Sequence, residues 1–590
     1  MTTTKRGRSA KAIVDDVLGH SMTLEIWSAN YEKVLPVSIQ DFDLSAVLSS
    51  VFFMFGFGYR RGKGNFLEVF GGSSGTPRER RQAATIERVA GKLASNQAFE
   101  GFNGEAEQAI LGDMLLTFCL ENNRRALGRK EQIQRTAPSH YMASWIDLPD
   151  SSGHLRSVPE MIVAMLADQD GNYVQADQQD GKSWFGVGRQ SFDNNLLLQA
   201  FNQGIVRSEG PVGRHSDKFQ EDSKVGLDQL LMIRLAQQLG AAPDKLRGRE
   251  GERISNQRPI SQQAAQQFSE DIRRFVRAYA NVIPRQAFVD LMESCMATGL
   301  TTIVTSVIEL LFHWANTGEI RQKAKQSPTP LFVDCSNGVD RKLRLLAEQS
   351  MDDFMRQIER VPAILMAMRL LDHGIRHDRR LRRQEVSIRP YATDWLNFLG
   401  DVLHERHKHA APLLDYFDRQ AEALAEQLGE EDYPEAAAIL RDDRTQANPV
   451  WRLAEALTFL QGRNNTRQRA ISLLDSSLMT DRPNGLAARR YVRRKDIAEG
   501  TARGHDVRSL VFTDSVMDYL VHLLVLPPGD KPGYRNLSLN RFIETIRDQY
   551  GFYLDQAPEG LSISNELLQV NRVVLERRLR DLGLLIGVND

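Results

Sequence analysis

The chain has 590 residues, 42% hydrophobic and 26% charged, which is enough apolar material for the cores of several domains. Its 75 basic and 76 acidic residues give a formal net charge of -1, which excludes a uniformly basic nucleic-acid-binding coat. The three scattered cysteines exclude a disulfide framework and a cysteine-rich zinc module, and they fit a reducing, cytoplasmic compartment.

Residues 1–145 are expected to form an N-terminal helical and glycine-rich region. The basic, polar N-terminus has no apolar segment behind it and is not a secretory signal. The most apolar run, 44–57, is shorter than the ~20 residues that a membrane helix needs, so it predicts a buried helix or strand and no membrane contact. Glycines 56–75 surround three basic residues and fit a tight loop or a phosphate contact, but Gly64 breaks the Walker A pattern.

Residues 146–225 are expected to be the β-containing segment of an otherwise mainly α, multi-domain protein. The pattern over 161–176 predicts a strand, a turn at Asp170–Gly171 and a second strand. Residues 226–526 predict helical domains, with helices over 227–239, 262–279 and 286–315. The proline- and glycine-rich loop 527–534 marks a boundary before a C-terminal module, 535–590.

The segment Cys335 to Arg341 has the Cys-x5-Arg spacing of cysteine phosphatases and lies between a strand-like and a helix-like run. In such a loop the cysteine is the nucleophile, while the arginine and the backbone amides hold the phosphate. Asp334 and Lys342 depart from that pattern, and no general acid is identifiable. The alternative is an ordinary turn from a strand into a helix.

Five of the twelve histidines lie between His373 and His409, and His373 and His377 are spaced to share a helical face. Metal ligands use this spacing, but the surrounding arginines and lysines repel a cation. Lys408 also breaks the zinc-protease pattern. We expect a polar surface here, with no metal and no other cofactor.

Two arginine clusters predict contacts with nucleic-acid phosphates, or else solvated faces paired with acidic segments. The first cluster holds Arg379, Arg380, Arg382 and Arg383. The second holds Arg489, Arg490, Arg493 and Arg494, with Tyr491 between them.

The C-terminal module resembles a winged helix. Ser564 is placed to cap a short helix, a turn is expected at Val570–Asn571, a second helix follows, and residues 582–588 fit a wing strand. This layout would direct a third basic set toward DNA, namely Arg572, Arg577, Arg578 and Arg580. The alternative is a helical hairpin that packs internally or docks a partner.

The runs LSAVLSSVFFMFGFGYRRGKGNF and GLSISNELLQVNRVVLERRLRDLGLLIGVND resemble large proteins encoded beside methyltransferases in bacterial anti-phage gene clusters of the methylation-associated defence type. The resemblance implies partner subunits and carries no catalytic motif. The expected function is an accessory, non-catalytic component that contacts DNA. The alternatives are a phosphoesterase using Cys335 and Arg341, and a helical scaffold that docks partner subunits.

Overall fold

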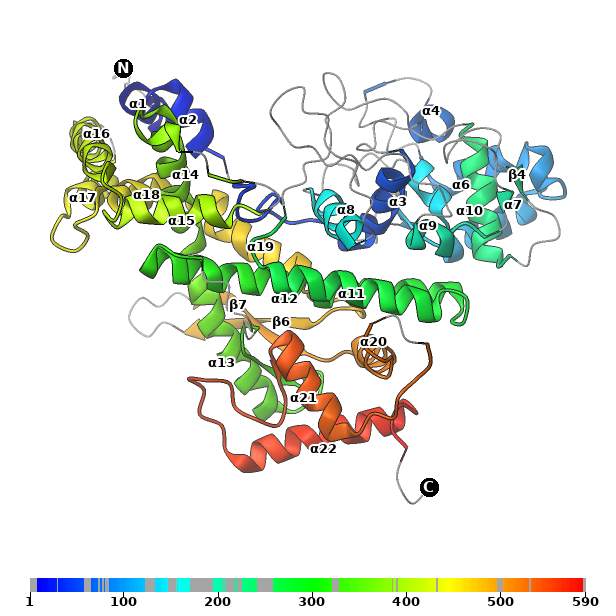
Figure 1. Cartoon of the computed structure of the whole chain (residues 1–590). Helices are drawn as coiled ribbons and strands as arrows, with labels where there is room; N and C mark the ends of the chain where they lie inside the picture. Colours follow the sequence, from blue (N-terminus) through cyan, green and yellow to red (C-terminus); the bar gives the residue numbers. More distant parts are fainter. Residues whose placement is uncertain are drawn as a thin grey trace.

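The fold was analysed in a computed structural model of the chain (Figure 1). The structure describes residues 8–586 apart from 29, 58–64, 73–74, 77–78, 80–83, 123–132, 147–154, 156, 170–194, 204, 207–217, 220–224, 241–257, 321–327, 385, 389–390, 431–432, 496–501 and 530–531. The basic residues 60, 61 and 63 of the glycine-rich stretch lie outside these ranges.

Two long helices, α11 (Gln262–Tyr279) and α12 (Arg285–Thr317), cross the middle of the molecule and separate its upper and lower parts (Figure 1). Helix α12 is apolar on nearly every side and ends at Gly318, whose φ of +73° suits a left-handed cap. By length and composition it is the one helix among the described residues that could cross a membrane, but 89% of its most apolar window is buried. It therefore forms the centre of the protein core.

The upper part contains two groups of elements on opposite sides (Figure 1). One group is helical and combines the N-terminus with the middle of the chain: α1 (Ala10–Leu18), α2 (His20–Ile26), α14 (Val361–His377), η5 (Leu381–Arg383), α15 (Thr393–Leu403), α16 (Ala410–Glu430), α17 (Pro434–Arg441), α18 (Pro449–Gln461), η6 (Arg463–Asn465) and α19 (Arg467–Ser477). Helix α1 packs on α16, so distant segments share this core.

The other group comes from residues 44–238 and is also mainly helical, with two short hairpins, β1–β2 and β3–β4. Its elements are η1 (Leu44–Ala46), α3 (Val47–Phe57), α4 (Phe66–Phe70), α6 (Ile86–Ala94), η2 (Gln97–Phe99), α7 (Glu105–Phe118), β1 (Leu120–Asn122), β2 (Ile133–Thr136), η3 (Tyr141–Trp145), α8 (Val158–Gln169), α9 (Leu196–Ala200), β3 (Ile205–Val206), β4 (Lys218–Phe219) and α10 (Leu227–Gln238).

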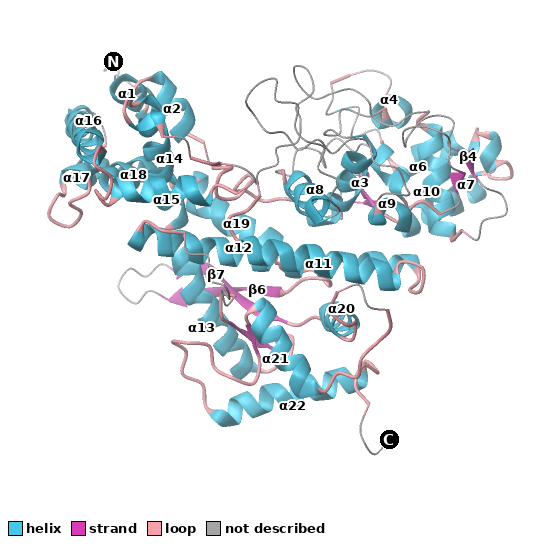
Figure 2. Cartoon of the chain, in the orientation of Figure 1, coloured by secondary structure: helices cyan, strands magenta, loops and turns pink. Residues whose placement is uncertain are grey.

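The lower part is built on a four-stranded sheet with the order β6-β7-β5-β8 (Figure 2). Strand β5 pairs in parallel with both β7 and β8, whereas β6 and β7 form a long antiparallel hairpin. The elements are β5 (Leu331–Asp334), α13 (Arg341–Ile358), β6 (Ala487–Lys495), β7 (Ala502–Val511), α20 (Asp514–Leu524), α21 (Leu539–Tyr550), β8 (Phe552–Tyr553) and α22 (Asn565–Asp581).

The mainly helical fold class is confirmed, and the predicted helices over 227–239, 262–279 and 286–315 correspond to α10, α11 and α12. The predicted strand beginning at Met161 is wrong, because those residues belong to helix α8, which is buried on nearly all sides. A continuous apolar run does not separate a buried helix from a buried strand. The expected turn at Asp170–Gly171 and the second strand lie outside the described residues.

The C-terminal module differs from the expected winged helix. The predicted turn at Val570–Asn571 is wrong, because one continuous helix, α22, spans Asn565–Asp581. Residues 582–586 contain no strand, and 587–590 lie outside the described part. Strand β8 pairs with β5, so residues 535–590 complete a sheet that begins at residue 331. The largest sheet therefore lies outside segment 146–225, where β-structure was expected.

Candidate nucleic-acid interface and adjoining pocket

The β6–β7 hairpin presents an exposed face with an aromatic residue between two arginines. Side chains alternate along a strand, so Arg489, Tyr491 and Arg493 share one face of β6. Tyr491 is 60% exposed. Its ring lies over Gly504 of β7, where an added Cβ would be 2.0 Å from the phenol oxygen. A glycine at this position leaves room for the ring to lie flat on the strand.

The charges on this face are only partly compensated. Arg489 Nε lies 3.2 Å from the Asp481 carboxylate, and its backbone N–H donates to the same group. Arg493 is exposed and makes no ion pair with the part of the chain that the structure describes. Within the described residues, this face therefore offers one aromatic ring and one guanidinium without an ion pair, and the exposed Asp506 of β7 lies opposite Tyr491.

The neighbouring Arg490 points to the opposite face of β6 and has a structural partner. Its guanidinium donates to both carboxylate oxygens of Glu348 on α13, at 2.8 and 2.9 Å. This pair fastens the hairpin to the helix and raises the pKa of Arg490, chiefly through the hydrogen bond. The predicted contact residue Arg494 has a side chain outside the described part.

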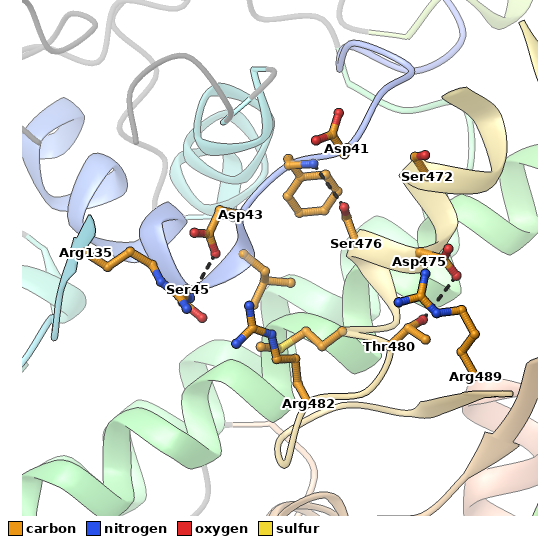
Figure 3. Close-up of a pocket in the computed structure, with 13 residues that line it drawn as sticks. Asp41, Asp43, Ser45, Arg135, Ser472, Asp475, Ser476, Thr480, Arg482 and Arg489 are labelled. Carbon is orange, nitrogen blue, oxygen red and sulfur yellow. Dashed lines mark hydrogen bonds and ion pairs between the residues drawn. The ribbon is translucent and has the colours of Figure 1, made fainter. Parts of the chain in front are cut away.

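A pocket of about 550 Å³ adjoins the base of the hairpin (Figure 3). Its walls come from residues 41–45 before α3, from Arg135 on β2, from α19 and from the turn that joins α19 to β6. Arg482 on that turn extends into the middle of the pocket, between Arg135 and Arg489 (Figure 3). Three segments far apart in the sequence thus place three arginines around one hollow.

Two of these arginines are held by carboxylates. Arg135 donates to Asp43 at 3.2 Å and pairs with Glu121 at 3.1 Å, while Arg489 pairs with Asp481. A second lining carboxylate, Asp475, pairs with Arg508 from β7 at 2.6 and 2.7 Å. Arg482 is exposed and has no ion-pair partner among the residues that are described.

The turn that carries Arg482 has an unusual backbone. Met479 and Asp481 adopt φ values of +48° and +62°, a region in which side chains other than glycine are uncommon. Asp481 N donates to Ala487 O at 2.9 Å, and Gly485 packs so closely that a Cβ would lie 2.0 Å from Met479 O. The surrounding contacts therefore impose a strained conformation that projects Arg482 into the pocket.

A second chamber of about 240 Å³ shares Ser45, Arg135, Met479 and Arg482 with the first. Its floor is acidic, with Asp290 and Glu293 one turn apart on α12. Burial raises the pKa of Glu293 to about 7, although hydrogen bonds from Asn484 and Ser45 oppose this shift. Burial likewise raises the pKa of Asp290. Glu293 therefore exchanges its proton near neutrality, unlike an exposed carboxylate.

The cluster formed by Arg379, Arg380, Arg382 and Arg383 lies in and beside η5, which packs on α14. All four residues are exposed, and none forms an ion pair with a described residue. The hairpin instead packs on α13. The two predicted arginine clusters are therefore separate basic surfaces. The first lies beside α14, and the second lies on a hairpin that packs against α13.

The four arginines of α22 divide into two kinds. Arg578 donates to the backbone carbonyls of Cys335 and Phe512, and Arg572 pairs with Asp555 at 3.3 Å. These two side chains hold α22 on the sheet. Arg577 and Arg580 are exposed, and each pairs with an acidic residue one turn away on the same helix. The helix does not present them as a set of free phosphate contacts.

The loop after β5 uses its polar groups internally. The Asp334 carboxylate accepts hydrogen bonds from Ser336 N at 2.8 Å and Gly338 N at 2.9 Å. Cys335 N donates to Asn571 Oδ1 at 2.9 Å. Burial, with the nearby charge of Asp334, raises the pKa of the fully buried Cys335 thiol. Arg341 is exposed at the start of α13.

A phosphatase loop needs free amides and an accessible thiolate. Here a carboxylate occupies the amides and the thiol is protonated. This geometry does not support the phosphoesterase hypothesis. The loop has the geometry of an ordinary turn from strand β5 into helix α13.

The clustered histidines also make structural contacts. The rings of His373 and His377 stack with centroids 4.0 Å apart, and His373 Nδ1 lies 3.3 Å from Glu25. Among the described residues, no three His, Cys, Asp or Glu side chains are grouped so that they could hold a metal ion.

The sequence predicted Arg489 and Arg493 as nucleic-acid contacts with Tyr491 between them, because the three residues lie on one short run. It gave no indication of Arg482, Arg135, Asp290 or Glu293, which lie on three separate segments without a local motif. The left-handed residues Met479 and Asp481 are detectable only from the backbone.

A comparison with known protein families identifies one family whose model matches nearly the whole chain. No curated protein and no solved structure matches the chain significantly. The model of the family described as methylation-associated defense system protein MAD7 matches residues 29–590. The suspected resemblance to methylation-associated defence proteins is thereby confirmed, and the chain belongs to the MAD7 family of methylation-associated defense system proteins.

Proposed function

We propose that the protein is a non-catalytic subunit of its defence system that binds nucleic acid through the exposed face of the β6–β7 hairpin. The observation that carries this proposal is Tyr491, which lies flat and exposed on Gly504 between Arg489 and Arg493. Aromatic rings on open strands stack on unpaired bases, and flanking arginines bind the phosphates. A stacking ring favours single-stranded segments over intact duplex, so single-stranded DNA is the expected ligand.

The basic surface at Arg379, Arg380, Arg382 and Arg383 is a second contact candidate, because it is exposed and free of ion pairs within the described chain. It would add phosphate contacts without reading bases. Together the two surfaces predict a salt-sensitive interaction, since each neutralised phosphate releases counterions.

The test is fluorescence polarisation of a labelled single-stranded oligonucleotide with the full chain at low salt. Tyr491→Ala is expected to weaken binding roughly 5- to 100-fold, because stacking on one base contributes about 1–3 kcal/mol. Tyr491→Phe keeps the ring and should stay within about two-fold of the unmodified protein. Arg493→Ala should weaken binding and reduce the slope of affinity against salt by roughly one.

The matched control is Arg356→Ala on α13, where the side chain is 75% exposed and pairs only with Asp353. It removes one arginine without touching the hairpin. If Tyr491→Ala and Arg356→Ala bind equally well, or if the unmodified protein does not bind at micromolar concentration, the proposed interface is wrong.

Docking of partner subunits is a second candidate function, favoured by the outer face of α22. Val570 and Val573 are exposed one turn apart, while Leu568, Leu575 and Leu579 of the same helix are buried. Val573→Glu should reduce co-purification of the other system subunits while leaving the fold intact, because the residue is 60% exposed. A truncation at residue 535 would be a poor test, since it removes β8 from the sheet.

A further inference from the structure

The pocket beside the hairpin and the acidic chamber adjoin each other and differ in chemistry. They meet at Arg482, which lines both chambers together with Ser45, Arg135 and Met479. One end is basic and rich in hydroxyl groups, and the other is acidic. A ligand that fills both must carry an anionic group at one end and hydrogen-bond donors at the other.

At the basic end, Arg482 supplies a positive charge that has no ion-pair partner in the part of the chain that the structure describes. Asp43 and Asp475 also line the space, but their charges are balanced by Arg135 and Arg508. Asp41, the third lining carboxylate, points away from Arg482 at the far rim (Figure 3). Arg482 thus remains the cation available to an entering anion, and its planar group suits two oxygens of a phosphate.

Hydroxyl groups surround the same space. Ser472, Ser476 and Thr480 line it from α19 and the following turn. Ser476 Oγ accepts a hydrogen bond from Phe42 N at 3.0 Å, which leaves its O–H free to donate. Ser472 Oγ donates to Gln468 O at 2.9 Å and Thr480 Oγ1 donates to Asp475 Oδ1 at 3.2 Å, so Ser476 is the lining hydroxyl that can donate to a phosphate beside Arg482.

At the acidic end, Glu293 is held in place by Asn484, whose Nδ2 donates to Glu293 Oε2 at 2.8 Å. Asp290 lies one turn earlier on α12, and Glu121 contributes a further carboxylate from β1. Carboxyl oxygens at the floor of a pocket accept hydrogen bonds from amino groups, as they do from the amino group of cytosine. Cation binding alone would leave Arg482 without a role.

We propose that this cavity binds a nucleoside monophosphate whose base carries an exocyclic amino group, with the phosphate on Arg482 and the base against Asp290 and Glu293. The volume of the first chamber, about 550 Å³, lies within the range of small-molecule sites, and the second chamber adds about 240 Å³. The raised pKa of Glu293, about 7, fits a group that exchanges hydrogen bonds with a neutral base. This site goes beyond the hairpin interface, because it takes a free nucleotide and does not require Tyr491.

The experiment is isothermal titration of the full chain with dCMP, dAMP, dTMP and inorganic phosphate. Saturable binding of dCMP or dAMP is expected, with dTMP at least ten-fold weaker because it lacks the amino group. Arg482→Ala should weaken dCMP at least ten-fold. Glu293→Gln should reduce the difference in affinity between dCMP and dTMP more than it reduces the affinity for inorganic phosphate.

The matched control is Arg463→Ala, which removes an exposed arginine that pairs with Glu359 and does not line either chamber. Thermal melting of each variant verifies its fold, and Arg482→Lys provides a second substitution that keeps the charge but loses the planar donor. Equal affinity of Arg482→Ala and Arg463→Ala, equal affinity for dCMP and dTMP, or no saturable binding of any nucleotide would overturn the proposal. Tyr491→Ala should retain dCMP binding, so failure of the hairpin interface is distinguishable from failure of this site.

Discussion

Arg578 on α22 donates a hydrogen bond of 2.6 Å to the backbone carbonyl of Cys335 at the carboxyl end of β5. The same nitrogen donates to Phe512 O at 2.7 Å, just beyond the end of β7. One side chain therefore joins the ends of two parallel strands to the C-terminal helix. In open parallel sheets this edge commonly holds a ligand, whereas here the chain's own helix occupies it.

Removing this guanidinium should destabilise the fold. Arg578→Ala leaves two carbonyls without a donor, and we expect a loss of roughly 2–4 kcal/mol in the free energy of unfolding. Urea denaturation followed by circular dichroism measures it. Arg577→Ala, one residue earlier and 82% exposed, should change stability by less than about 0.5 kcal/mol. If Arg578→Ala weakens DNA binding at unchanged stability, the role assigned to Arg578 is wrong.

The neighbouring Asn571 should be equally sensitive. Its buried amide donates to Val333 O and Leu554 O at 2.9 and 2.8 Å and accepts from Cys335 N. Asn571→Ala leaves three buried backbone groups unsatisfied and should cost roughly 3 kcal/mol or more. Asn565→Ala, at the exposed start of the same helix, is the comparison. Similar unfolding midpoints for the two variants would contradict this bridging role.

The cysteines should be unreactive in the folded protein. Cys119, Cys295 and Cys335 are all fully buried, and burial raises the pKa of each thiol. Ellman's reagent at pH 8 should therefore titrate none of them until denaturant is added. Turnover of a chromogenic phosphate ester should be the same for the unmodified chain and Cys335→Ser. Rapid labelling of Cys335 in the native state would revive the phosphoesterase hypothesis.

The free energy of unfolding should decrease as pH rises from 4.5 to about 7, because Glu293 holds its proton more tightly in the folded state. Its pKa is raised by burial from 4.5 to about 7, so the folded state holds the proton more tightly than the unfolded chain. The contribution is fully present below pH 4.5 and is lost as pH approaches 7. It amounts to at most about 3 kcal/mol, since one pKa unit corresponds to about 1.4 kcal/mol.

Glu293→Gln should remove this part of the pH dependence. The charged groups around Glu293 are Glu121 on β1, Asp228 on α10, Arg135, Arg482 and Asp290. They remain in the variant, as does an acceptor for Asn484. Melting temperatures between pH 5 and 8 should therefore fall less for Glu293→Gln than for the unmodified chain. Parallel curves would show that another group controls the dependence.

The contact between α12 and α15 depends on two glycines. A Cβ on Gly400 would lie 1.8 Å from the carbonyl oxygen of Gly318, so Gly400→Ala forces the backbones apart. We expect a loss of at least about 2 kcal/mol. Gly91→Ala on α6 is the matched substitution, because its nearest neighbour is the flexible Gln108 side chain at 3.4 Å. It should be neutral or stabilising by up to about 1 kcal/mol, and thermal melts of the two variants test the contrast.

The sequence predicted the helices well where the pattern was long and periodic, as in α11 and α12. It failed at Met161, because an apolar run buried on all sides has no period that separates helix from strand. It also failed at Val570–Asn571, where a winged-helix layout predicted a turn between two helices. In the structure Asn571 lies inside α22 because its amide is satisfied by β5 and β8, a contact that no local pattern contains.

The sequence by itself determined the mainly helical class, the absence of disulfides, the resemblance to the defence family and the run that holds Arg489, Tyr491 and Arg493. These follow from composition and from residues close together in the chain. Only the tertiary structure decided that Arg490 and Arg578 bind groups within the protein, whereas Arg482 has no ion pair with a described residue. It also decided that Arg135, Arg482 and Glu293 line one cavity. Whether an arginine is paired or available depends on which distant carboxylate or carbonyl the fold places beside it, and that information is not local.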